Sequence, residues 1–198
     1  GSGKSTLINL LSGYIEPTIG KIYFDKVNIR NISIENKAFI RSVMSQSQPI
    51  VFDFSVKEII EMGWLQKGFI KFSESFNKIF EEVIKEASIE DLVNEKFNVL
   101  SGGEQKRVHF ARTLLQSWRP SDSTDPNYLL LDEPTANLDI KHEQRLMNVV
   151  RKKAARGIGI LIVLHDINLA AKYSDKIILL KEGKLKGYGE AHEILNEN

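Results

Sequence analysis

The first residues of the chain have the types and spacing of a phosphate-binding loop. They match the closing half of the pattern G-x-x-x-x-G-K-[ST] and run Gly1, Ser2, Gly3, Lys4, Ser5 and Thr6. Glycines let backbone N–H groups approach phosphate oxygens, Lys4 can reach the β- and γ-phosphates, and the Ser5 hydroxyl suits Mg²⁺. The pattern's opening glycine would precede Gly1, so we expect the chain to begin inside this motif. A short Gly/Ser/Lys turn is also an ordinary helix start, so this fragment alone leaves both interpretations open.

Two acidic residues follow an apolar run in the second half of the chain. The run Tyr128–Leu131 is typical of a buried parallel strand, and Asp132 and Glu133 come directly after it. Ligands of α/β sheets bind at the carboxyl ends of the strands. There Asp132 suits Mg²⁺ coordination and Glu133 could polarise an attacking water, whereas the alternative is an acidic turn ended by Pro134. Together with a phosphate-binding loop, the pair predicts nucleotide hydrolysis.

A second Ser/Gly turn leads into a helix in the middle of the chain. It reads Leu100-Ser101-Gly102-Gly103-Glu104-Gln105, and apolar residues continue at helical spacing from Val108 to Leu115. Backbone N–H groups at a helix start attract anions, so this turn is a second candidate phosphate contact. The alternative is a helix that the Ser101 side chain caps, with no ligand.

Two further polar residues follow predicted strands. His165 comes directly after Ile160–Leu164, and Gln46 follows Val43 and Met44 closely. A neutral imidazole at a strand end could hydrogen-bond a γ-phosphate or the attacking water. The Gln46 amide could lie near Mg²⁺ or the same water. Single histidines and glutamines are more often ordinary surface residues, so that alternative stays open for both.

The composition limits the possible function classes. The chain has 198 residues, 42% of them apolar and 27% charged, which suits one α/β domain with a sizeable core. Its 27 basic and 26 acidic residues give a net charge of +1, so nothing electrostatic favours nucleic acid as a partner. The absence of cysteine excludes disulfides and thiolate metal sites. The longest aliphatic run is too short to cross a bilayer, so we expect any membrane role to come through a partner.

Strands and helices alternate along most of the chain, which predicts an α/β fold with a mainly parallel sheet. We expect strands within residues 21–24, 27–29, 42–44, 128–131 and 160–164, and a hairpin at 177–188. Residues 50–115 instead show helical spacing, with a capping box at Ser55 and Glu58, which indicates an inserted α-helical subdomain. We therefore predict a single domain, 1–198, whose α/β core consists of 1–49 and 116–198.

Taken in order, these motifs resemble those of the nucleotide-binding subunit of ABC transporters, a family of P-loop NTPases. The matching segments are Gly1–Thr6 (Walker A), Gln46 (Q-loop), Leu100–Gln105 (the LSGGQ-type signature), Leu129–Glu133 (Walker B), Ala136–Asp139 (D-loop) and His165 (the switch histidine). The resemblance covers essentially the whole chain. It implies a P-loop NTPase core that binds ATP and Mg²⁺ and hydrolyses the ATP.

The resemblance also implies residue roles. The implied catalytic residues are Glu133, as general base, with His165 and Gln46, and the implied Mg²⁺ ligands are Ser5, Gln46 and Asp132. Two copies of the chain would sandwich two ATP molecules. Each ATP would then contact residues 1–6 of one copy and Ser101, Gly102 and Gly103 of the other.

Within the family, the chain resembles the ATPases of importers for hemin, siderophores and vitamin B12. Residues 164–171 and 187–190 carry this resemblance, and the long loop 117–127 favours the hemin importers. The implied partners are transmembrane permease subunits and, indirectly, a periplasmic or surface substrate-binding protein. The implied location is peripheral, on the cytoplasmic side of the cell membrane.

Two other functions stay open from the sequence. A non-transport ABC ATPase would act on ribosomes or DNA, but such proteins usually carry two ATPase units or long coiled-coil insertions, which this sequence does not show. A regulatory subunit without turnover is the other possibility, and the intact Lys4, Asp132, Glu133 and His165 disfavour it. The chain departs from many relatives at Ser45, where they have proline, and we expect this to change loop stiffness more than chemistry.

Overall fold

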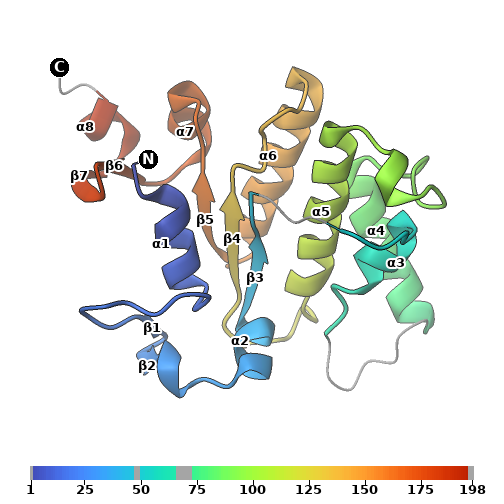
Figure 1. Ribbon diagram of the computed structural model, residues 1–198, viewed down its shortest axis with the longest axis horizontal. Helices are drawn as coiled ribbons and strands as arrows, with labels where there is room; N and C mark the ends of the chain where they lie inside the picture. The colour runs from blue at the N-terminus through green and yellow to red at the C-terminus, as the bar shows by residue number, and fades with distance from the viewer. Residues whose placement is uncertain (1, 47–49, 66–72, 196–198) are drawn as a thin grey trace.

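A parallel sheet of three strands forms the centre of the molecule. The computed structural model describes residues 2–46, 50–65 and 73–195 (Figure 1). Strands β3 (Arg41–Met44), β4 (Tyr128–Asp132) and β5 (Gly159–Val163) lie in the order β3-β4-β5, and β4 is parallel to both neighbours. All three strands therefore end at the same edge of the sheet, and the predicted mainly parallel sheet is confirmed.

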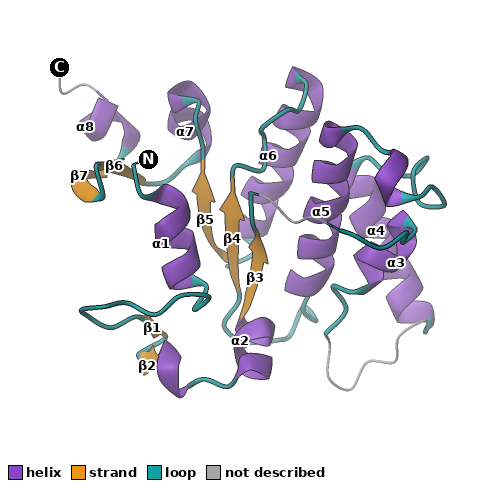
Figure 2. Ribbon diagram, viewed as in Figure 1, coloured by secondary structure: helices purple, strands orange, loops and turns teal. Residues whose placement is uncertain are grey.

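Helices cover both faces of this sheet (Figure 2). Helix α1 (Lys4–Leu11) lies on one face, where it packs with Leu130 of β4. Helices α5 (Gly102–Ser117) and α6 (Ile140–Ala155) lie on the other face, where Leu131 is fully buried in the main core. Burial on both faces explains why β4 reads as a continuous apolar run rather than an alternating one.

Helices occupy the described chain between β3 and β4. Helices α3 (Val56–Glu61) and α4 (Glu74–Ala87) both pack against α5. The buried face of α4 consists of Phe76, Ile79, Phe80, Val83, Ile84 and Ala87. Within the described residues of this segment, the only β pairing is an isolated bridge between Ser55 and Lys96. The limits of a helical subdomain at 50–115 stay a prediction.

Two antiparallel hairpins and several short helices complete the described chain. The hairpins are β1 (Tyr23–Phe24) with β2 (Val27–Asn28), and β6 (Ile177–Lys181) with β7 (Lys184–Gly189). The short helices are α2 (Ile34–Ile40), α7 (Ile167–Tyr173) and α8 (Ala191–Leu195), with 3₁₀ turns η1 (Ile29–Asn31) and η2 (Phe97–Val99). In the ranges that the structure describes, no helix is long and apolar enough to span a membrane.

Candidate functional site

The predicted phosphate-binding loop leads directly into α1. Gly3 caps the helix with a φ of 92°, a left-handed conformation that glycine adopts without strain. The loop is held in place because the Gly183 N–H donates to the Ser2 carbonyl at 3.1 Å. The Lys4 ammonium donates to the Ser2 hydroxyl at 2.8 Å. Gly1 lies outside the described residues. The first N–H groups of α1 and a lysine are therefore present together, as phosphate binding requires.

The three predicted catalytic side chains meet at the carboxyl edge of the sheet. Gln46 follows β3, Glu133 follows β4 and His165 follows β5 closely. The Gln46 Nε2 donates to Glu133 Oε2 at 2.7 Å, and His165 Nε2 lies 2.7 Å from Glu133 Oε1. Their expected placement at strand ends is confirmed, because parallel neighbouring strands bring their carboxyl ends together. The two oxygens of the Glu133 carboxylate thus have separate partners.

The backbone of Glu133 adopts an unusual conformation. Its φ is 51°, a left-handed value that costs energy for any residue with a Cβ. Its N–H donates to the Val163 carbonyl at 3.2 Å. Its carbonyl accepts from the Ala136 N–H at 3.3 Å and from the Lys106 ammonium of α5 at 2.7 Å. Three hydrogen bonds from two neighbouring segments and the following turn therefore fix the direction of this residue.

Asp132, at the end of β4, has the environment of a cation ligand. The residue is only 3% exposed, and its Oδ1 atom is buried without a hydrogen-bond partner. A buried carboxylate oxygen is costly unless a cation or a donor neutralises it. Oxygen ligands of this kind suit Mg²⁺. The described residues hold no cluster of three or more His, Cys, Asp or Glu side chains that could bind a metal. A cation at Asp132 would therefore need hydroxyl, amide or phosphate oxygens as its other ligands.

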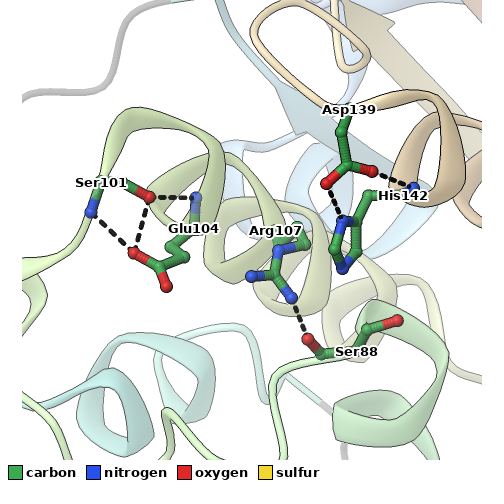
Figure 3. A network of polar contacts seen from close by, with 6 residues as sticks. All are labelled: Ser88, Ser101, Glu104, Arg107, Asp139 and His142. Carbon is green, nitrogen blue, oxygen red and sulfur yellow. Dashed lines mark hydrogen bonds and ion pairs between the residues drawn. The ribbon is translucent and has the colours of Figure 1, made fainter.

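The start of α5 is a helix cap formed by Ser101 and Glu104 (Figure 3). The Ser101 hydroxyl and N–H donate to Glu104 Oε2 at 2.6 and 2.8 Å, and the Glu104 N–H donates back to the hydroxyl at 3.4 Å. The Ser101 hydroxyl and N–H together hold the pKa of Glu104 below its usual value. Ser101 and Gly102 are exposed. The capped helix start considered from the sequence is confirmed, while an anion contact here stays a prediction.

Gly103 has a structural reason to be glycine. A Cβ at this position would lie 2.9 Å from the carbonyl oxygen of Asn137, in the turn before α6. Asn137 itself is left-handed, with φ of 65°. Asp139 caps α6 in the same turn, since its carboxylate accepts from the His142 N–H at 2.8 Å and lies 2.7 Å from the His142 ring (Figure 3). The signature turn and the predicted D-loop are therefore packed backbone against backbone.

Comparison with known proteins decides the family. Residues 1–136 match the family model of the ABC transporter. The chain belongs to the ABC transporter family. It is 40% identical, over 195 residues, to the hemin import ATP-binding protein HmuV of Bartonella henselae, which covers 98% of this chain and 73% of that protein. The protein of the same name from Rhizobium meliloti is 34% identical over 197 residues, 100% of this chain and 74% of that one.

Solved ABC structures share the fold. The dimeric structure of MJ0796, a bacterial ABC transporter cassette, matches with a TM-score of 0.82 and 29% identity, over 96% of this chain and 81% of that chain. A bacterial Atm1-family ABC exporter with ATP bound matches with a TM-score of 0.81 and 26% identity, over 99% of this chain and 33% of that one. The predicted P-loop NTPase fold is confirmed, and this ABC ATPase binds and hydrolyses ATP. The names of these proteins lend no support to a role on ribosomes or DNA.

One polar residue of the ABC ATPase site escaped the sequence motifs. Lys106 lies on α5, yet its ammonium reaches the backbone carbonyl of Glu133, directly after β4. The next residue, Arg107, is also basic but points elsewhere and donates to the Ser88 carbonyl at the end of α4 (Figure 3). The sequence does not tell which of the two neighbouring basic residues reaches Glu133. A basic residue on a helix with a buried face was the only available signal.

Proposed function

We propose that this ABC ATPase uses Glu133 as the general base of ATP hydrolysis and that the hydrolysis drives hemin import. The contacts of the Glu133 carboxylate with Gln46 and His165 carry the catalytic part of this proposal. The identity of 34–40% with hemin import ATP-binding proteins, over nearly the whole chain, carries the transport part. The sequence also resembles the ATPases of siderophore and vitamin B12 importers, so these two substrates are the alternatives to hemin.

Glu133 is placed to take a proton from the attacking water. One of its carboxylate oxygens accepts the proton while the water oxygen bonds to the γ-phosphorus, and the bond to the β-phosphate oxygen breaks to release ADP and phosphate. The His165 side chain is 66% exposed, so it can leave Glu133 and donate to a γ-phosphate oxygen. Gln46 keeps its bond to the second Glu133 oxygen and so orients the base. Base catalysis of this kind contributes about 10²- to 10⁴-fold to a rate.

The phosphate groups would be held by the start of α1. Residues 1–6 supply backbone N–H groups, and Lys4 supplies a positive charge that reaches the β- and γ-phosphates. Mg²⁺ fits this site because Asp132 has a buried oxygen without a partner. The other protein ligands of the ion would be Ser5 and Gln46. Ser5 is half-buried and is the second residue of α1. When bound, the ion supplies charge neutralisation between the phosphates.

Two copies of the chain are needed to complete each site. Helix α1 and the start of α5 lie on opposite faces of the sheet, so one chain does not bring its two phosphate-binding turns together (Figure 1). The dimeric structure of the MJ0796 cassette supports a paired arrangement. In a two-fold dimer, Ser101, Gly102 and Gly103 of one copy contact the ATP held by the loop of the other. ATP then closes the dimer, and its hydrolysis opens it.

The partners follow from the role in import. Permease subunits in the membrane receive the motion of the dimer, so the chain is peripheral on the cytoplasmic side. A substrate-binding protein on the other side of the membrane would act through the permease. The described residues 50–65, with exposed Val51 and Phe52 beside α3, offer apolar surface for the permease contact.

A growth experiment tests the transported substrate. A host that lacks this gene is grown with hemin, a ferric siderophore or vitamin B12 as the limiting nutrient. We expect the wild-type gene to restore growth on hemin and Glu133→Gln to restore none. Restored growth on the siderophore or on vitamin B12, but not on hemin, would show that the substrate is assigned wrongly.

A purified protein tests the catalytic part separately. We expect Glu133→Gln to bind ATP like the wild type and to release phosphate at least about 100-fold more slowly. Turnover by this variant at the wild-type rate would sink the assignment of Glu133 as the base.

A further inference from the structure

We propose that Lys106 is a positioning residue that holds Glu133 in its hydrolytic conformation and links it to the start of α5. The proposal rests on the proposed role of Glu133 as the base. Lys106 does not contact the reacting atoms. It acts through a hydrogen bond of 2.7 Å from its ammonium to the main-chain carbonyl of Glu133.

The bond acts on a backbone that needs support. Glu133 has a φ of 51°, a region that a residue with a Cβ leaves unless its surroundings hold it there. Its N–H donates to the Val163 carbonyl at 3.2 Å and its carbonyl accepts from the Ala136 N–H at 3.3 Å, and both of these bonds join neutral groups. The Lys106 bond is shorter and carries a full charge, so it is the strongest of the three. Without it, the carbonyl can rotate and the carboxylate turns with it.

The charge of Lys106 also faces the acidic end of β4. The residue is half-buried, and burial lowers its pKa. The negative charges of Glu133 and Asp132 act in the opposite direction and favour the ammonium form. An ammonium in this place reduces the electrostatic repulsion between two carboxylates at one strand end. The same charge keeps Lys106 directed at the site rather than at solvent.

Lys106 connects the two phosphate-binding regions of the dimer through a rigid element. It lies on α5 five residues after the N-cap Ser101, about 7.5 Å along the axis at 1.5 Å per residue. A movement of the α5 start, when it meets ATP held by the second copy, therefore moves the Lys106 side chain too. Glu133 then receives its final orientation only when both copies are engaged.

Three variants and one control test this role. Lys106→Met removes the donor and the charge with little change in side-chain size. Lys106→Ala also removes both, and alanine has the highest helix propensity, so it does not weaken α5 through the backbone. Lys106→Arg keeps a cationic donor of similar reach. The matched control is Lys96→Met, because the exposed Lys96 also donates to a main-chain carbonyl, that of Asp53 at 2.9 Å, far from Glu133 in the sequence.

We expect Lys106→Met and Lys106→Ala to lower kcat by about 10- to 100-fold while the KM for ATP changes less than about 2-fold. Lys106→Arg should recover most of the rate, and Lys96→Met should leave both constants unchanged. The proposal is overturned if both non-polar variants turn over at the wild-type rate. It is also overturned if kcat, KM and the urea midpoint shift together and arginine restores none of them, which would indicate a structural role alone.

The outcomes for Lys106 and for Glu133 can be separated. A Glu133→Gln variant that hydrolyses ATP normally removes the base on which the proposal depends. An inactive Glu133→Gln variant beside a fully active Lys106→Met variant leaves the proposed function in place and refutes only the role of Lys106.

Discussion

Alanine at Gly103 is expected to separate the start of α5 from the turn before α6. The new Cβ would lie 2.9 Å from the Asn137 carbonyl oxygen, whereas carbon–oxygen contacts in proteins fall at about 3.3–3.6 Å. The obstacle is backbone, and Asn137 already has a left-handed φ, so it cannot turn aside as a side chain would. Overpacking of this kind costs about 1–3 kcal/mol.

The neighbouring glycine provides the matched control. A Cβ on Gly102 meets nothing within 4 Å, so Gly102→Ala gains the usual advantage of losing a flexible glycine from the unfolded chain, about 0.4–1 kcal/mol. The two variants have the same composition and lie in the same helical turn. The gain from the unfolded chain is the same for both substitutions and cancels, so we expect Gly103→Ala to be less stable than Gly102→Ala by roughly 1–3 kcal/mol, the cost of the overpacking.

Urea unfolding without nucleotide measures this difference, because the predicted contact with ATP of a second copy is then absent. The midpoints give the two free energies of unfolding if the slopes agree. Equal stability of the two alanine variants would refute the argument that Gly103 is required by the Asn137 backbone. The motif glycine would then have only its predicted contact with phosphate to explain it.

Two further predictions concern charged groups away from Glu133. Lys153→Met should lower the free energy of unfolding by about 2 kcal/mol, because it leaves the half-buried Glu86 carboxylate, 2.9 Å from the buried Lys153 ammonium, without its partner. The double variant with Glu86→Gln should regain most of this loss, and a purely additive result would contradict the pairing. The low pKa of Glu104 makes its contribution to stability present above its ordinary pKa of 4.5 and lost as the pH falls through the folded value. The stability advantage of the wild type over Glu104→Gln, from urea unfolding, should therefore shrink as the pH falls from neutrality through 4.5 and below, and a constant difference would contradict the capping geometry.

The catalytic edge of the site could be predicted because strand ends are easy to read. Apolar runs locate the strands, a parallel sheet brings their ends together, and Glu133 and His165 come immediately after two of the runs. The sequence therefore predicts a shared location without any knowledge of distances. The contact between their side chains, at 2.7 Å, is the simplest consequence of that topology.

The missed features depend on contacts between distant segments. The Lys106 bond to Glu133 joins residues 27 positions apart, and nothing in a local pattern tells where a long side chain ends. The contact of Gly103 with Asn137 depends on the exact approach of two backbones. The first hairpin is also shorter than predicted, since the Asn28 side chain accepts from the Arg30 N–H and starts a 3₁₀ turn where the sequence suggested strand. Local capping outcompeted β propensity there.

The composite site is the central claim, and mixing two inactive variants tests it most directly. Lys4→Ala disables the phosphate loop, and Ser101→Arg disables the start of α5, so each homodimer should be inactive. In a mixed dimer, one site combines the intact Lys4 of one chain with the intact Ser101 of the other. Random mixing makes about half of the dimers mixed, each with one good site, so the rate should return to about a quarter of the wild-type value. If the mixture stays as inactive as its two components, the two phosphate-binding turns do not complete each other across a dimer.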